Sequence, residues 1–186
     1  MALADTIYVD ADATGTPDGL SWTTAFTNVQ DALDLTNGVS STTDCEIWVA
    51  EGVYYPDEDG DGGHTDNDES ESFTLSYNNV QLYGGFDPQS NVDEWGERDW
   101  EAHVTVLSGD LQQDDTDNDG NSIADPSTDI QGSNAYHVLF LDGTTNAITE
   151  ATVIDGFTIT AGQADGSNPH DRGGGLYGNG SGGGSE

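Results

Sequence analysis

The sequence predicts an all-β fold in which short strands stack in parallel as the coils of a β-solenoid. The chain repeats short segments that are rich in Val, Ile, Tyr and Phe and that end at Gly, Asp or Asn, as strands do. Only one stretch has helical spacing, which argues against alternating βαβ units. The links between segments are long and lack two-residue Asn-Gly or Asp-Gly turns, so a solenoid is favoured over a hairpin-built sandwich.

Seven segments have this strand character. They cover residues 6–10, 46–55, 72–75, 79–86, 103–109, 136–143 and 151–160. Each coil of a solenoid buries its inward side chains only against its neighbours, so the first coil needs a cover.

A helix near 23–35 is the predicted cover. Its apolar positions recur at helical spacing and are Trp22, Phe26, Val29 and Leu33. Thr23 or Thr24 is available as N-cap, and Asn37-Gly38 as the stop. An ordinary surface helix packed on a sheet is the alternative interpretation.

The whole chain, 1–186, is predicted to be one domain. It divides into a cap region at 1–45, coils at 46–162 and a glycine-rich loop or tail at 163–186. We expect it to be the N-terminal part of a longer solenoid, because the glycine-rich end offers no second cover.

Charge limits the partners of this protein. Its 36 acidic residues face only Arg98 and Arg172, which gives a formal net charge of -34. Such a surface repels nucleic acid and anionic lipid, whereas cations are natural partners. No apolar run is long enough for membrane insertion. Cys45 is the single cysteine, so no disulfide can form within the chain. Adaptation to high salt and loading with calcium both explain the charge, and "ALA" at 2–4 is compatible with a secreted protein.

Several motifs carry a resemblance to a known group of proteins. They are "IYVDADATGTPDGLSWTTAFTNVQDAL", "EIWVAEGVYYP", "VQLYGGF", "RDWEAHVTVLSGD", "YHVLFLDG", "VIDGFTITAG" and "GGGLY". Together they resemble the N-terminal region of bacterial surface proteins with right-handed parallel β-helix repeats, and the last two also look like motifs of chlamydial polymorphic outer-membrane proteins. The resemblance implies a right-handed parallel β-helix of the pectate-lyase-like superfamily, which polysaccharide-active enzymes, adhesins and structural solenoids share.

The segment "DTDNDG" predicts a calcium site. Asp115, Asp117 and Asp119 alternate on a loop that Gly120 lets bend sharply, so their carboxylates can converge on a hard cation. The closing glutamate of an EF-hand is missing. The remaining candidate ligands are Asn121 and Asp125, with Asp129 as the alternative to Asp125.

A second copy of this hexad supports the prediction of calcium-binding loops. Asp57, Asp59 and Asp61 alternate before a glycine, and Asp68 stands at the twelfth position. The alternative is that both loops are merely solvated acidic loops of a salt-adapted protein.

Function is predicted less directly. The first hypothesis is a non-catalytic, secreted or cell-surface, calcium-binding protein that acts as a stalk, adhesin or self-assembling filament component. Its partners would be further copies bound through the solenoid ends, or a glycan or other cell-surface ligand. The alternative is a polysaccharide-active enzyme, either a lyase or a glycoside hydrolase. Trp48, Trp95, Trp100 and Tyr83 are candidates for stacking on sugars, and Trp95 and Trp100 are favoured because they flank a loop.

Overall fold

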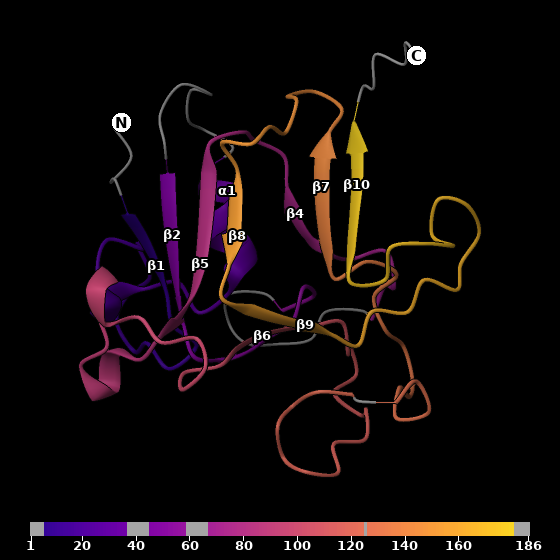
Figure 1. Cartoon of the computed structure of the whole chain (residues 1–186), viewed down its shortest axis with the longest axis horizontal. Helices are drawn as coiled ribbons and strands as arrows, with labels where there is room; N and C mark the ends of the chain where they lie inside the picture. Colours follow the sequence, from indigo (N-terminus) through magenta and orange to yellow (C-terminus); the bar gives the residue numbers. More distant parts are fainter. Residues whose placement is uncertain (1–5, 37–44, 59–66, 125, 181–186) are drawn as a thin grey trace.

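The computed structural model describes residues 6–36, 45–58, 67–124 and 126–180. Ten strands in these ranges form three sheets (Figure 1). The strands are β1 (Thr6–Val9), β2 (Cys45–Ala50), β3 (Gly52–Tyr54), β4 (Phe73–Leu75), β5 (Val80–Phe86), β6 (Thr105–Ser108), β7 (Leu139–Gly143), β8 (Val153–Asp155), β9 (Phe157–Thr160) and β10 (Leu176–Gly180). Their orders are β1-β2-β5-β8, β10-β7-β4 and β3-β6-β9.

Every pairing between these named strands is parallel. Parallel neighbours require a long crossover. From β2 onward, strands that are consecutive in the chain lie in different sheets, so that β2, β3 and β4 belong to three different ones, whereas β1 and β2 are neighbours in the first sheet. Each sheet is consequently assembled from segments that are far apart in the sequence.

The predicted all-β, right-handed parallel β-helix, or β-solenoid, is wrong. The strands form three separate short sheets of four, three and three strands, not a closed solenoid, and with their helix they give a mixed arrangement of the α/β kind. The prediction failed because strand-like segments with long links indicate parallel pairing but do not determine whether the sheets close into coils.

Two predicted strands are each broken by a glycine. The segment 46–55 divides just before Gly52, whose φ is 142° and which begins β3, and the segment 151–160 divides at Gly156, whose φ is 82°. Glycine alone adopts such angles readily. Each glycine passes the chain from the first sheet to the third, so β2 is followed by β3 and β8 by β9.

The predicted helix is shorter than expected. Residues Trp22–Thr24 form a 3-10 turn, η1, and the α-helix α1 covers only Val29–Thr36. Ala25 is extended (φ -59°, ψ 153°), and Phe26 bridges Val9. Because Asn28 Oδ1 accepts from the N–H of Gln30 at 2.6 Å, an asparagine side chain serves this helix start, not Thr23 or Thr24.

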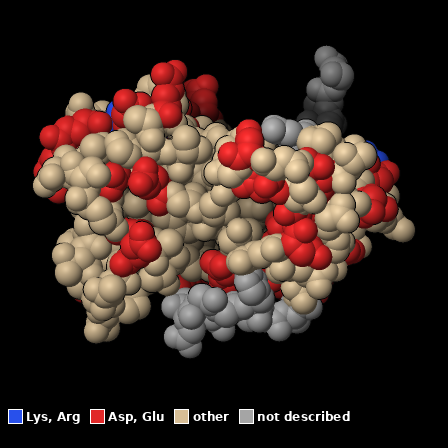
Figure 2. All heavy atoms as spheres, turned by 90° about the horizontal axis from the view of Figure 1, so that it is seen from below, with Lys and Arg blue, Asp and Glu red and all other residues tan. Residues whose placement is uncertain are grey.

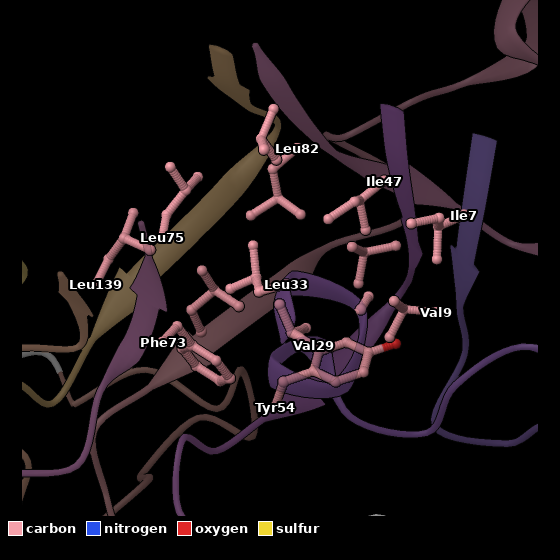
Figure 3. Close-up of a cluster of buried hydrophobic side chains, with 14 of the residues drawn as sticks. Ile7, Val9, Val29, Leu33, Ile47, Tyr54, Phe73, Leu75, Leu82 and Leu139 are labelled. Atoms are coloured by element: carbon pink, nitrogen blue, oxygen red, sulfur yellow. The ribbon is translucent and has the colours of Figure 1, made fainter. Parts of the chain in front are cut away.

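The core lies between the sheets and α1. Figure 3 shows side chains of the first sheet and those of β4 and β7 directed toward Val29 and Leu33 of the helix. Apolar residues of the helix and of all three sheets are almost fully buried, among them Ile7, Ile47, Leu75, Leu82 and Leu139. Burial of each contributes about 1.5–3 kcal/mol, which makes this core the rigid base from which the loops extend.

Two further 3-10 turns, η2 (Pro88–Ser90) and η3 (Trp95–Glu97), lie in the loop after β5. None of the helices in the described ranges has the length and apolar character that crossing a bilayer requires.

Candidate cation site

The acidic segment between β6 and β7 is anchored where it leaves the sheets. Asp110 and Asn134 form an isolated antiparallel bridge, and the N–H of Ala135 donates to the carbonyl of Gly109 at 2.8 Å. Leu111 and Ala135 are fully buried. In Figure 1 this segment projects below the sheets. Its base is therefore fixed, although most of its length is exposed.

Three carboxylates meet at this base: those of Asp110, Asp114 and Asp115. One oxygen of each lies within 4.8 Å of one oxygen of the others. The N–H groups of Asp114 and Asp115 donate to the two oxygens of Asp110 at 3.1 and 2.9 Å. Each carboxylate oxygen has two lone pairs, so these bonds orient Asp110 and leave it able to bind a cation.

Asp115 is the most constrained member of the group. Its Oδ1 accepts from the N–H of Gln131 at 2.6 Å, and its Oδ2 accepts from Nδ2 of Asn134 at 2.9 Å. Burial, together with the charges of Asp110 and Asp114, raises the pKa of Asp115 despite these hydrogen bonds. The ionised form is thus disfavoured by its surroundings, and a positive charge bound there would remove that penalty.

Asn134 is a buried amide that contacts the carboxylate of Asp115. It is 1% exposed, and Nδ2 donates both to Asp115 and, at 3.0 Å, to the carbonyl of Ala161. Its Oδ1 has no hydrogen-bond partner among the described residues. A buried amide oxygen without a partner is costly, and amide oxygens are calcium ligands.

A pocket of about 140 Å³ opens next to this group. It is lined by Tyr55, Asp110, Gln113, Asp115, Thr116, Asp117, Ser122, Ile123, Ala124, Thr160 and Ala161. Burial and the charges of Asp110, Glu58 and Asp115 raise the pKa of Tyr55 to about 12. This phenol is therefore neutral at pH 7 and presents an oxygen in a strongly negative environment.

The structure brings together only part of the predicted hexad. Asp117 lines the same pocket as Asp115, but its carboxylate accepts from the N–H groups of Gly120, Asn121 and Ser122. These bonds, that of Ser122 first, lower the pKa of Asp117. Asp119 accepts from Nδ2 of Asn121 at 3.1 Å. Asp117, Asp119 and Asn121 thus order the turn, and Asp125 lies outside the described residues.

Sequence reasoning missed Asp110 and Asp114. The signal was present in "GDLQQDD", where carboxylates stand four and five positions after the aspartate that follows β6. Their convergence depends on the bridge between Asp110 and Asn134, which no local spacing reveals.

The other predicted loop is only partly described. Asp57 is buried, at 4% exposure, whereas Asp68 is at the surface and accepts from the N–H and the hydroxyl of Ser70. Asp59 and Asp61 lie outside the described residues. The start of this loop approaches the other acidic segment, because Nε2 of Gln113 donates to Oε1 of Glu58 at 3.2 Å.

Negative charge is spread over the surface. On the face shown in Figure 2, acidic side chains are scattered across the molecule, and basic atoms are visible only near its outline. Arg172 pairs with its neighbour Asp171 at 2.8 Å. The cluster at the loop base shares this negative sign, but its Asp110 is buried and its Asp115 is half-buried.

A second group of potential ligands lies at the ends of β2 and β5. Nδ1 of His103 is 2.9 Å from Oε2 of Glu51 and 3.5 Å from Oδ2 of Asp87. Burial acts to raise the pKa of Asp87, but hydrogen bonds from Ser90 and the neighbouring histidine outweigh it, so this pKa is lowered. These contacts fasten the loop after β5 to the end of β2.

Arg98 fastens the same loop at another point. Its Nη2 is 2.7 Å from Oδ2 of Asp155, and its side chain is 6% exposed. The guanidinium lies over the rings of Tyr83, Trp95 and Trp100 at 4.9–5.5 Å. Its ion-pair partner therefore lies on β8.

A wider pocket lies beside η1. Its volume is about 350 Å³, and its walls are Asp10, Asp12, Ala13, Thr14, Trp22, Thr23, Pro88, Gln89 and Asp93. Burial is the first cause that raises the pKa of Asp10, and Nε2 of Gln89 donates to this carboxylate at 3.2 Å. The pocket combines one indole with several hydrogen-bonding groups.

Comparison of the chain with protein-family models, with curated proteins and with solved structures gives no match. The resemblance to β-helix surface proteins therefore remains a prediction from the motifs, and any account of function depends on the sites described above.

Proposed function

We propose that this protein is a non-catalytic calcium-binding structural protein, and that the loop between β6 and β7 holds the ion. The observation that carries the proposal is the convergence of the carboxylates of Asp110, Asp114 and Asp115. Three carboxylates are a hard, oxygen-only ligand set.

The chemistry of the ligands favours calcium over softer metals. No sulfur or imidazole is among the residues that line the adjoining pocket, and calcium accepts six to eight oxygen ligands in a flexible geometry. The carboxylates lie on a loop whose base is fixed and whose outer part is exposed, which suits a cation that keeps some of its water.

Charge supports an extracellular location and a structural role. A net charge of -34 repels itself, and bound divalent cations reduce that repulsion. Calcium-binding modules outside cells work at dissociation constants of about 10⁻⁴–10⁻³ M. We place this protein at the cell surface or in a secreted matrix, as a stalk, an adhesin or an assembling component.

Assembly would use the outer strands of the sheets. β8, β9 and β10 each pair on one side only within the described residues, and such strand edges can accept another chain. Light scattering with and without Ca²⁺ tests this part of the proposal. A strictly monomeric protein in both conditions would remove it.

Thermal melting with Ca²⁺ against a chelator, repeated in molar KCl, is the main experiment. A rise in Tm that is specific to Ca²⁺ supports a bound ion, and an equal rise in KCl alone indicates charge screening instead. Asp115→Asn should abolish most of the calcium-specific rise, because it changes the central ligand. Glu150→Gln, which removes an exposed charge outside the cluster, is the matched control.

A second candidate function is glycan binding or cleavage at the pocket beside η1. Its size of about 350 Å³ suits one or two sugar rings, Trp22 offers an apolar face, and Asp10, Asp12 and Gln89 can bind hydroxyl groups. A sugar-release assay on neutral and acidic glycans distinguishes an enzyme from an adhesin. Loss of glycan binding in Asp10→Asn would assign either activity to this pocket.

A further inference from the structure

Two histidines from distant parts of the chain meet beside the second sheet. His137 precedes β7 and is 6% exposed. His170 lies in the loop before β10 and is half-buried. Nε2 of His137 is 3.2 Å from Nδ1 of His170, so the two imidazoles present ring nitrogens to each other.

The tautomer of His137 is fixed by its other nitrogen. Nδ1 of His137 is 3.2 Å from the carbonyl oxygen of Gly173. A carbonyl only accepts, so Nδ1 carries the hydrogen and Nε2 holds the lone pair. His170 therefore donates from Nδ1 in the metal-free form. A histidine that ligates a metal usually donates its other N–H to a carbonyl or carboxylate in this way.

Aromatic rings hold both imidazoles in place. Tyr177 stacks on His137 with centroids 4.6 Å apart and an interplanar angle of 17°. Tyr136 lies 4.7 Å from the ring of His170, and the two imidazoles themselves are stacked at 5.2 Å. Burial is the main cause that lowers the pKa of His137, which keeps its lone pair free at neutral pH.

We propose that His137 and His170 form a binding site for an imidazole-preferring divalent transition metal, such as Cu²⁺, Ni²⁺ or Zn²⁺, separate from the oxygen-only calcium site. Two nitrogens bound tetrahedrally at about 2.0–2.1 Å from zinc stand about 3.3 Å apart, close to the observed separation of 3.2 Å. The nitrogens are thus already spaced as two ligands of one ion.

Binding requires one change of tautomer. His170 moves its hydrogen from Nδ1 to Nε2, so that Nδ1 can donate a lone pair to the metal, and no net proton is released from the neutral pair. Within the described ranges, no cysteine, carboxylate or further histidine joins the two to make a three-ligand group. Water completes the coordination, which leaves the ion exchangeable.

The test is a Cu²⁺ titration of the whole chain by calorimetry and electron paramagnetic resonance. A background of about 10 mM Ca²⁺ saturates the oxygen-only sites and separates this proposal from the calcium proposal. We expect one saturable Cu²⁺ site with nitrogen hyperfine structure. His137→Gln and His170→Gln should each weaken it by about tenfold or more, whereas His103→Gln should leave it unchanged.

His170→Gln is the decisive variant, because this side chain belongs to a loop and its loss is the less disruptive to folding. Ring ¹⁵N NMR of the wild-type protein with Zn²⁺ gives a second readout that needs no variant: the resonances of both histidines should shift together. Absence of a saturable site, retention of it in His170→Gln, or its loss only in His103→Gln would overturn the proposal.

Discussion

Replacing Asp114 with Asn should change stability in opposite directions with and without calcium. The carboxylate of Asp114 lies within 4.8 Å of those of Asp110 and Asp115, and the side chain is exposed. In the absence of metal its charge only repels its neighbours. In the presence of calcium it is a ligand.

The two effects are of similar size. At 4.8 Å and with water-like screening, each like-charge pair costs about 1 kcal/mol. In the presence of a chelator, the variant should therefore be about 1–2 kcal/mol more stable than the wild type. Calcium at about 100 times its dissociation constant stabilises the wild type by about 2.7 kcal/mol. A tenfold weaker site would retain about 1.4 kcal/mol of that gain at the same concentration.

Thermal melting measures both effects. In a chain of this size 1 kcal/mol corresponds to about 2–4 °C in Tm, so calcium should raise the wild-type Tm by roughly 5–10 °C and that of Asp114→Asn by about half as much. Glu150→Gln, with the same loss of charge, should keep the full calcium response. Two outcomes would contradict the reasoning: a full rise in Tm with calcium in Asp114→Asn, or a lower Tm of this variant than of the wild type in chelator. Either would show that the three carboxylates do not repel one another and bind calcium together.

Three other perturbations test the fold and its titration. Arg98→Gln should lower the free energy of unfolding, measured in urea, by about 2 kcal/mol, because it removes three cation–π contacts of about 0.5–1 kcal/mol each and the ion pair with Asp155. A loss below about 0.5 kcal/mol would contradict the view that this arginine stabilises the loop after β5. Gly156→Ala should lower the free energy of unfolding by more than about 1 kcal/mol, because the φ of Gly156 is 82° and an added Cβ would lie 2.8 Å from the carbonyl oxygen of Gly84. Gly96→Ala is the control: Gly96 has open space around it, so this change should be nearly neutral. Burial lowers the pKa of His137 below its unfolded value of about 6.5, so below about pH 6.5 the native state binds fewer protons than the unfolded state, and the free energy of unfolding should fall as the pH drops. Thermal melting of the wild type and of His137→Gln between about pH 7.5 and 5.5 should therefore show a smaller decline of Tm in the variant. Equal declines would refute this reasoning.

The strands could be predicted from the sequence because their side chains alternate and their ends carry glycine or asparagine. Ile7, Ile47 and Leu82 occupy equivalent positions in β1, β2 and β5, and they align in register in the sheet. β10 was not predicted, since "LYGNG" is rich in glycine and has little strand propensity. Its partner β7 supplies the order that its own sequence lacks.

The architecture and the sites could not be predicted because they depend on contacts between distant residues. Alternation determines which face of a strand is buried but not which strand lies beside it, so the closed solenoid was the wrong extrapolation from correct local signals. Asp117 fitted the calcium pattern by spacing, yet its carboxylate is turned toward the N–H groups of its own loop. Asp110 becomes part of the cluster only through the bridge to Asn134.

The separation of paired strands in the sequence has a consequence for how the chain acquires its structure. Gln81 of β5 is opposite Val153 of β8, and Phe73 of β4 is opposite Leu139 of β7; these partners are 72 (153 − 81) and 66 (139 − 73) residues apart. Such nonlocal pairing makes folding slow, on the order of milliseconds to seconds, and during that time apolar strand edges are open to other chains. The many carboxylates make these partly folded chains repel one another. The negative charge that destabilises the folded protein therefore also reduces aggregation while the chain folds.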